Sequence, residues 1–322
     1  MDFDLVYATP ENVDQGVLLD FTFDLAFGES ENDFKLEMPL MSHCMEEDYR
    51  VYIEGTEYGG IIDSITVDTN NQTIAYEGRT WHGIFNSKVI TPHTGDDYYV
   101  ISGDANDILA QIITEFGLGE LFEAESEASG IVLTSTNVDR YKNAYDVLLK
   151  IFRENGGKLK FTYEGNKCKI ECVPLIDYSQ DEEFDSDQLT FKIQKNYNPV
   201  NHLICLGKGE LKDRTRIDLF ADANGNISTT QTITGLAEVV AVYDYSSVES
   251  VEELEKEGRK HFEEIRKDGD IDVNLEQTQD YDISDKIGAI EYTTGISVVK
   301  YISKKIVKID SKGTTINYNI NG

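Results

Sequence analysis

Apolar and polar residues alternate along most of the chain, a pattern typical of strands with one buried face. The first pair of alternating segments flanks a polar turn at residues 28–33, and its apolar positions are Leu19, Phe21, Phe23, Leu25 and Phe27, then Phe34, Leu36, Met38 and Leu40. A second pair flanks the turn at 68–71, with Ile61, Ile65 and Val67 before it and Ile74 and Tyr76 after it. These hairpin signals predict one antiparallel β domain over residues 1–98.

Residues 99–198 change to a helical period followed by a hairpin. Asp104 is a suitable N-cap for a helix whose apolar face is Ile108, Leu109, Ile112, Ile113 and Phe116, with Gly117 as its stop. A second helix begins at Asn143 and ends at Gly156-Gly157. Between the helices we predict an acidic loop with one short strand at 131–134. The following hairpin should place Tyr163 opposite Cys168 and Phe161 opposite Ile170, so this region is a compact α+β unit.

The last third, residues 199–322, returns to strands with one helix inserted. The sequence Asp222-Ala-Asn-Gly-Asn226 predicts a hairpin turn, and Ile316, Tyr318 and Ile320 alternate in the final strand. Residues 248–266 predict a charged amphipathic helix with the apolar stripe Val251, Leu254, Phe262 and Ile265. The expected fold is therefore mainly β, with two β domains on either side of a helix-plus-hairpin domain.

The charge of the chain restricts its partners. Its 322 residues include 60 Asp and Glu against 29 Lys and Arg, a net charge of −31, while 10% of residues are aromatic. The aromatic content excludes a disordered acidic tail, and the charge argues against nucleic-acid binding and against anionic membranes. The N-terminus has neither a basic nor an apolar segment of a signal peptide, and no apolar run reaches 18 residues. We expect synthesis and folding in a cytoplasm, without membrane anchoring.

The four cysteines do not predict disulfides or metal binding. Cys168 and Cys172 have the same strand parity as Ile170 and would lie about 13 Å apart, too far for a bridge. Cys205 has the setting of a core residue. The sequence contains no CxxC or HxxxH pair, so we expect no metal site.

No motif assigns catalysis or a cofactor. The turn at Asp222 fails as a calcium loop because its Gly comes too early and Ile233 stands where a Glu should close the loop. Gly207-Lys-Gly209 lacks the rest of a dinucleotide fingerprint. His43 and Cys44 would point to opposite faces of an extended strand, so they cannot pair there. Trp81 suggests either a sugar platform or, more in keeping with its neighbours, a strand leading into a packed turn. We predict no catalytic, cofactor-binding or metal-binding residues.

Four stretches, in this order and spacing, resemble the hub family of long-tailed phage tail tips, the Siphovirus Gp-thirty-seven-like group. They are Ile74–Trp81 running to Ile90–Pro92, Ser102–Leu109, Asn143–Leu149 with Gly156-Gly157, and Tyr281–Ala289 with Thr294–Ile296 and Lys305–Ile309. Two departures concern the subfamily. The family often has two basic residues where Ser87-Lys88 stands, and it prefers Gly where Ser284 stands.

The resemblance implies a role as well as a fold. Hubs of this family are trimers in which each chain contributes two tail-tube-like β-barrels, here about 1–98 and 199–322. The middle unit would lie on the outside or at the tip, and segments can exchange between domains. The resulting pseudo-six-fold ring joins a hexameric tail tube above to a trimeric spike, fibre or lysin below. A tape-measure protein is a further partner. The chain would then be located in a virion tail tip or baseplate, assembled in the bacterial host cytoplasm.

The charge fits two explanations within this role. Asp and Glu on the inner wall of a tube would repel DNA phosphates during passage, or the acids simply make a soluble surface. Two other functions stay open beside the non-enzymatic hub: a tail-associated cell-wall hydrolase, and a carbohydrate-binding adhesin that uses the 18 Tyr and Trp81.

Overall fold

The computed structural model describes most of the chain, namely residues 4–179, 183–185, 191–248, 250–266, 269–273, 280–291 and 293–321. Contacts between residues divide it into two compact units. Unit 1 comprises Met1–Thr190, Val273–Ala289 and Val299–Asn321, and unit 2 comprises Phe191–Asp272, Ile290–Val298 and Gly322. This division differs from three consecutive domains over 1–98, 99–198 and 199–322, because C-terminal segments return to pack with the N-terminal ones.

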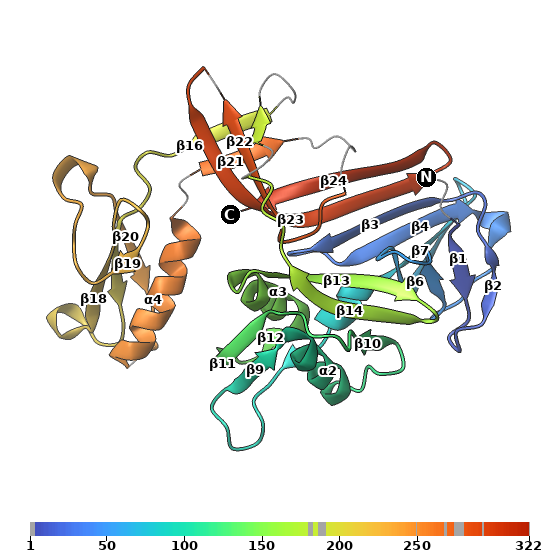
Figure 1. The fold of residues 1–322 in the computed structure, drawn as a ribbon, viewed down its shortest axis with the longest axis horizontal. Helices are drawn as coiled ribbons and strands as arrows, with labels where there is room; N and C mark the ends of the chain where they lie inside the picture. The colour runs from blue at the N-terminus through green and yellow to red at the C-terminus, as the bar shows by residue number, and fades with distance from the viewer. Residues whose placement is uncertain are drawn as a thin grey trace. The chain divides into compact units, whose positions relative to one another are not determined.

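Unit 1 is built on a large sheet with strand order β15-β22-β23-β3-β4-β7-β6-β5-β1-β2, in which β24 also pairs with β23 (Figure 1). In chain order the strands are β1 Val6–Ala8, β2 Asp14–Val17, β3 Thr22–Gly28, β4 Asp33–Pro39, β5 Arg50–Tyr52, β6 Gly59–Asp68, β7 Thr73–Thr80, β15 Glu183–Asp185, β22 Lys286–Glu291, β23 Ile296–Asp310 and β24 Gly313–Asn321. The order is an open path. None of the sheets in the described residues closes into a barrel, so the predicted barrels are not confirmed.

The pairing of β3 with β23 explains why the N-terminal region is not a domain by itself. Leu25 lies opposite Val307 and Phe23 lies opposite Ile309, and all four side chains are buried. The predicted alternation in β3 and β4 is confirmed, with Phe23 opposite Leu36 across that hairpin. Periodicity assigns a face to each strand, but it carries no information about the partner.

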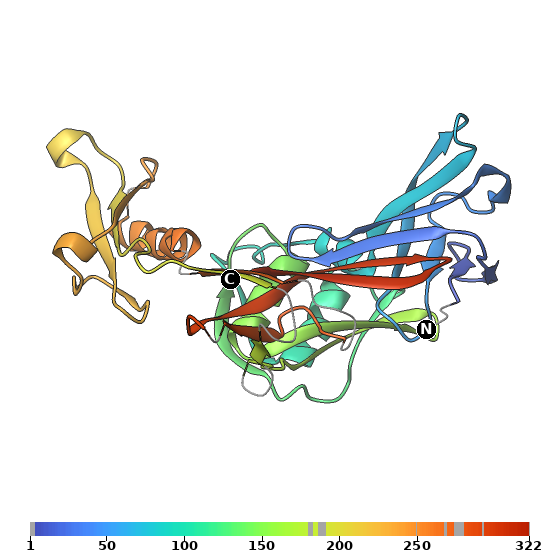
Figure 2. The ribbon, with the colours of Figure 1, turned by 90° about the horizontal axis from the view of Figure 1, so that it is seen from above.

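The other face of this sheet is polar and follows cross-strand rows. One row runs Lys308, Asp24, Lys35, Glu77 and Ser64 across five neighbouring strands. Opposite charges on facing positions of an antiparallel pair stabilise it modestly. The long β6–β7 hairpin continues beyond the body of the unit (Figure 2), and the core-side residues Ile65 and Val67 near its tip are 39% and 50% exposed.

The middle region adds helices and small sheets to unit 1. Its helices are α1 Trp81–Asn86, α2 Ala105–Glu115 and α3 Ala144–Glu154, and its strands are β8 Val89–Ile90, β9 Tyr99–Asp104, β10 Phe122–Ala124, β11 Val132–Val138, β12 Lys142–Asn143, β13 Gly157–Glu164 and β14 Lys167–Pro174. The predicted hairpin register is confirmed, since Tyr163 pairs with Cys168 and Phe161 with Ile170. The strand expected at 131–134 is displaced and longer, and it pairs with β9.

The helix boundaries follow the local signals in the sequence. Asp104 caps α2 by accepting a hydrogen bond from the Asn106 N–H at 2.9 Å. Asn143 occupies the N-cap position of α3 as predicted, but its side chain donates instead to the Asn86 carbonyl. The segment after Thr80 is a short helix rather than a packed turn, because the Thr80 hydroxyl caps it by accepting from the Gly83 N–H.

One hydrophobic core joins the large sheet to the middle region. Trp81 is fully buried and stacks on Tyr163 of β13 at 4.8 Å between ring centroids. His82 is also buried and stacks on Phe27 of β3 at 4.4 Å. The core continues without a break across residue 98, so no domain boundary lies there.

Unit 2 is a small sheet covered on one face by a helix. Its strands are β17 His202–Leu206, β18 Arg216–Ala221, β19 Ile227–Ser228 and β20 Val240–Asp244, and the helix is α4 Val251–Ile265. Two further strands, β16 Phe191–Lys195 and β21 Gly269–Val273, pair with each other, and single 3-10 turns occupy Leu40–Ser42 in unit 1 and Leu211–Asp213 and Gly235–Ala237 in unit 2. The core consists of Leu203, Cys205, Leu219, Ala221, Val248, Leu254 and Phe262.

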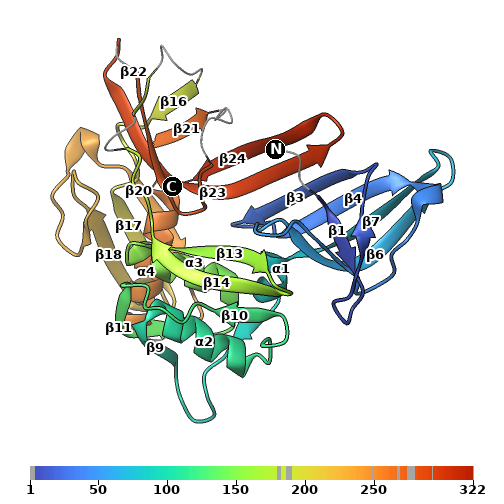
Figure 3. The same cartoon turned by 45° about the vertical axis from the view of Figure 1, so that its right-hand side comes forward.

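The inserted helix of unit 2 was predicted with nearly correct bounds. Leu254 and Phe262 of its apolar stripe are fully buried, whereas Val251 is 46% exposed. The predicted turn is also confirmed: Asp222 accepts hydrogen bonds from the backbone N–H groups of Asn224 and Asn226. Figure 3 shows the strands of the large sheet of unit 1 and of the small sheet of unit 2 after a turn of 45° from the view of Figure 1.

Candidate functional site: a buried ion-pair network

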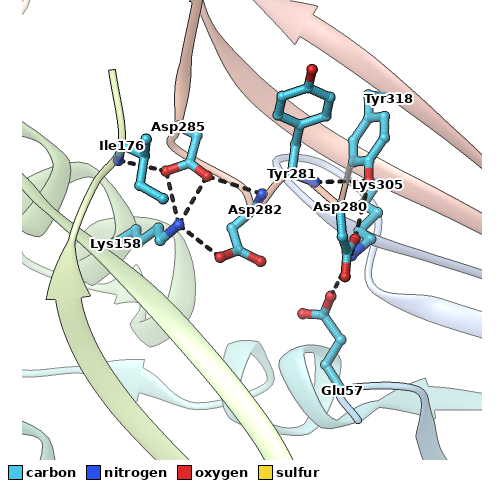
Figure 4. A network of polar contacts seen from close by, with 9 residues as sticks. All are labelled: Glu57, Lys158, Ile176, Asp280, Tyr281, Asp282, Asp285, Lys305 and Tyr318. Atoms are coloured by element: carbon cyan, nitrogen blue, oxygen red, sulfur yellow. Dashed lines mark hydrogen bonds and ion pairs between the residues drawn. The ribbon is translucent and has the colours of Figure 1, made fainter. Parts of the chain in front are cut away.

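Two buried lysines, each held by carboxylates, connect the C-terminal part of unit 1 to other segments, Lys158 to the middle region and Lys305 to Glu57 in the N-terminal region (Figure 4). Lys158, on β13, is 3% exposed. Its Nζ lies 2.9 Å and 2.8 Å from the two carboxylate oxygens of Asp285 and 2.7 Å from Asp282 Oδ2. Burial alone would lower the pKa of Lys158, but the two carboxylates outweigh it and raise that pKa. The ammonium group is therefore kept charged inside the protein.

Asp285 is saturated with donors. It is fully buried, and besides Lys158 it accepts hydrogen bonds from the backbone N–H of Ile176 at 2.8 Å and of Asp282 at 3.1 Å. The Ile176 bond comes from the segment that follows β14. One carboxylate thus ties the segment 282–285 to β13 and to the residues that follow β14, and buried charges persist in proteins when they are paired in this way.

Lys305, on β23, forms the second centre of the network. It is 1% exposed, and its Nζ lies 3.0 Å from Glu57 Oε1 and 2.7 Å from Asp280 Oδ1. The ammonium also lies 5.4 Å from the ring centre of Tyr58 and 5.9 Å from that of Tyr318, within the range of a cation–π contact. Burial opposes the charge of Lys305, yet Glu57 and its other neighbours raise the pKa well above its ordinary value.

Glu57 links this centre to the aromatic core. Burial would raise its pKa, but the Lys305 ammonium and a contact with His82 lower the pKa to about 2. His82 Nε2 lies 3.6 Å from Glu57 Oε2, while its other ring nitrogen, Nδ1, has no hydrogen-bond partner among the described residues. Burial lowers the pKa of His82, so the ring is neutral near pH 7.

The segment 280–285 that supplies the aspartates is held from both sides. The Tyr281 N–H donates to the Tyr318 hydroxyl at 3.1 Å, and the Ser284 N–H donates to the Ile302 carbonyl at 2.8 Å. Ser284 has φ = 79°, in the left-handed region that favours glycine. This explains in physical terms why glycine suits the position in the family that the sequence resembles.

We call this network a structural latch, because its ion pairs hold segments of unit 1 together that lie far apart in the sequence. Each lysine is charged and fully paired, so neither is a nucleophile, and the described residues around them offer no activated hydroxyl or thiol. The sequence did not indicate these residues as a site. In the sequence, the one signal of this network is the cluster of Asp280, Asp282 and Asp285. Asp282 and Asp285 lie in the fourth stretch that resembles the hub family, and Asp280 directly precedes that stretch. Lys158 is hidden in an ordinary strand pattern.

The other residues considered in the sequence lie apart from this network. Cys168, Cys172 and Cys205 are fully buried core residues as predicted, and burial raises the pKa of the Cys168 thiol well above its usual value. His43 Nδ1 lies 2.8 Å from the Tyr76 hydroxyl rather than near a thiolate partner. Among the described residues, no three His, Cys, Asp or Glu side chains gather as metal ligands.

The polar face of the large sheet contains a shallow hollow of about 500 Å³. Its charged lining residues are Asp24, Glu31, Asp33, Lys35, Asp63, Glu77 and Arg79. Arg79 is bound by Asp63 at 2.6 Å and 2.8 Å, so its charge is already matched. None of the described helices is long and apolar enough to cross a membrane.

Comparison with solved structures relates this fold to phage tail proteins. The chain is similar to the 43 kDa tail protein of prophage MuSo2 from Shewanella oneidensis, with a TM-score of 0.57 at 11% identity over 99% of this chain and 98% of that one. It is also similar to a tail protein from Neisseria meningitidis MC58 (TM-score 0.53, 12% identity, 100% and 97% covered) and to prophage tail protein gp18 from Listeria monocytogenes EGD-e (0.55, 14%, 99% and 94%). No protein-family profile and no curated protein sequence matches the chain.

The likeness covers both units and nearly all of each compared protein. At these identities it establishes the fold, which this chain shares with prophage tail proteins from end to end. The expected relation to phage tails is thus supported at the level of fold, and the finer assignment to a hub is developed below.

Proposed function

We propose that this chain is a non-enzymatic structural protein of a phage or phage-derived tail. The observation that carries the proposal is the shared fold over 94–100% of this chain and of three tail proteins from different bacteria. The buried ion-pair network fits such a role, because it stabilises a fixed arrangement of distant segments and contains no reactive group. The order of the four sequence stretches supports the narrower assignment to the hub of a tail tip or baseplate.

In this role three copies form a ring that joins the tail tube above to a spike, fibre or lysin protein below. The expected mass of the ring is about 109 kDa, three times 36.3 kDa. Mass photometry of the purified chain, repeated after adding a tail-tube protein, tests this. A chain that stays at 36 kDa in both conditions contradicts the ring.

The polar face of the large sheet is our candidate for the wall of the channel. Facing positions there alternate in charge, as in the row from Lys308 to Glu77, so this face is mixed rather than uniformly acidic. Such a wall has few cationic groups free to hold DNA, because acids pair with them. The hollow on this face is lined by five carboxylates and two cations, so the candidate wall also carries a net negative charge.

Neither alternative function gains a specific observation. Trp81 is buried against Tyr163 and cannot serve as a surface platform for a sugar. A cell-wall hydrolase needs an acid and a base or a metal at one cleft, whereas the carboxylates of the network described above are paired with two buried lysines. A peptidoglycan zymogram that clears would contradict the non-enzymatic assignment.

A further inference from the structure

Among the described residues, the part of the large sheet from β24 to β6 has an edge without a partner strand at each end. The order is β24, β23, β3, β4, β7 and β6, and in the described residues β24 pairs only with β23 (Figure 1). At the other end β5 covers only Gly59–Ile61 of β6. The stretch Ser64–Asp68 therefore has no strand on its outer side among the described residues. Unpaired backbone groups on an edge are a template for another strand.

The two edges carry few of the features that keep edges apart. Natural sheets protect their edges with charges, proline or bulges. The strand β24, Gly-Thr-Thr-Ile-Asn-Tyr-Asn-Ile-Asn, has no charged residue and no proline in a chain of which 28% is charged. Residues 64–67 of β6 are likewise uncharged, and they lie between a register shift at Ile62–Ser64 and the charged Asp68. The polar row across the sheet has charged residues on its inner strands. It ends in uncharged residues on the two edge strands, Thr315 on β24 and Ser64 on β6.

Both edges also present the same distribution of apolar and polar side chains. On the core side, β24 carries Ile316 opposite Val307, and β6 carries Ile65 opposite Tyr76. On the other side, β24 carries Thr315 and β6 carries Ser64. If the two edges met, apolar residues would continue the apolar face and neutral polar residues would continue the polar face. The partial exposure of Ile65 and Val67 would be removed.

Strand direction makes the two edges compatible in a head-to-tail arrangement. Every neighbouring pair from β24 to β6 is antiparallel. Because the strands are even in number, β24 and β6 run in opposite directions. A second copy placed beside the first, with the same face inward, therefore brings the two edges together as an antiparallel pair. Head-to-tail contacts of this kind generate a ring when the rotation between neighbouring copies closes, and an open filament when it does not.

We propose that β24 of one copy pairs with residues 64–68 of β6 in a second copy of this chain. The proposal rests on the ring suggested above and names the surfaces that close it. The absence of charge at both edges fits a self-association that must bring together chains of net charge −31. A different tail protein at either edge is the competing occupant, and the test below separates the two.

Disulfide trapping tests the pairing directly. In a Cys44→Ser background, Thr315→Cys is combined with Ser64→Cys or with Thr66→Cys to allow for register. Within one copy the two edges are five strand spacings apart, roughly 24 Å, so an intramolecular bridge cannot form. We expect covalent trimers or a ladder of multiples on a non-reducing gel. The matched control, Thr315→Cys with Asn137→Cys on an exposed position of β11, should give no ladder.

A charge substitution gives an independent readout. Asn317→Lys on β24 should weaken self-association by roughly tenfold or more, whereas Asn137→Lys, the same change at another exposed strand position, should not. Trimers that form without any β24–β6 cross-link would overturn the edge pairing while leaving the ring intact. Monomers without cross-links, also in the presence of a tube protein, would overturn both. Cross-links only to a coexpressed tail protein would overturn the choice of a second copy.

Discussion

Units 1 and 2 hold themselves together in different ways. In unit 1, segments far apart in the sequence meet through buried charges, as Lys158 of β13 does with Asp285. In unit 2, the core is a helix on a small sheet, and its polar pairs lie near the surface. The two ring nitrogens of His202 each lie 2.7 Å from a carboxylate oxygen, Nδ1 from Glu238 and Nε2 from Asp218. Asp218 also binds Arg216, whose side chain is 54% exposed.

The difference predicts unequal responses to mutation. Removing one partner of a buried pair leaves an uncompensated charge in a dry environment, whereas exposed pairs contribute little. Unit 1 should therefore be sensitive at a few charged positions and unit 2 at its apolar ones. Trp81, the single tryptophan, lies in the core of unit 1, so its fluorescence follows the unfolding of that unit alone.

Lys158→Met should have the largest effect. It leaves Asp285 buried without its cation and should lower the free energy of unfolding of unit 1 by about 3–5 kcal/mol. Urea unfolding followed by Trp81 fluorescence measures this. Lys150→Met is the control, since Lys150 is an exposed partner of Glu154 and should contribute less than about 0.5 kcal/mol. Equal losses in the two variants would contradict the buried-latch interpretation.

Phe262→Ala is the corresponding test in unit 2. Deleting this fully buried ring should cost about 3 kcal/mol there. Amide hydrogen exchange in β17 and β18 should become faster, while the Trp81 unfolding midpoint stays where it was. Val251→Ala, at an exposed position of the same helix, should change neither. A shift of the Trp81 midpoint in Phe262→Ala would show that the two units unfold together.

Acid should weaken unit 1 through Glu57. Its pKa in the folded protein is about 2, below the ordinary 4.5, so the unfolded chain binds the proton first. The stabilisation is complete above about pH 5 and is lost as the pH falls toward 2, with a total of roughly 3 kcal/mol. Unfolding by urea at several pH values measures the slope. Glu57→Gln should flatten it, and Glu47→Gln, at an exposed loop position, should not.

Ser284→Gly should have the smallest effect of the four changes, and it should raise the free energy of unfolding of unit 1. Glycine relieves the left-handed backbone at φ = 79° and removes a buried hydroxyl that has no partner among the described residues. The net gain should be about 1 kcal/mol by Trp81-monitored unfolding. Ser284→Ala removes the hydroxyl but keeps the strained backbone, so it should gain less. A loss of stability in the glycine variant would mean that the hydroxyl has a role in the latch.

Local features of this protein were predictable from sequence because they depend on neighbours in the chain. The cap at Asp104, the hairpin pairing Phe161 with Ile170, and the stripe Leu254–Phe262 on α4 all follow from period and turn chemistry. The latch was not predictable, because Lys158 and Asp285 lie far apart in sequence and each looks like an ordinary polar residue in its own segment.

The sequence by itself determined the element types, the buried face of most strands, and an acidic chain without recognisable catalytic motifs. Only the tertiary structure decided that β23 and β24 complete the N-terminal sheet, that one core crosses residue 98, and that two lysines are buried among carboxylates. The physical reason is that an alternating pattern specifies which side of a strand avoids water. It leaves open which strand lies beside it, and that choice depends on contacts summed over the whole fold.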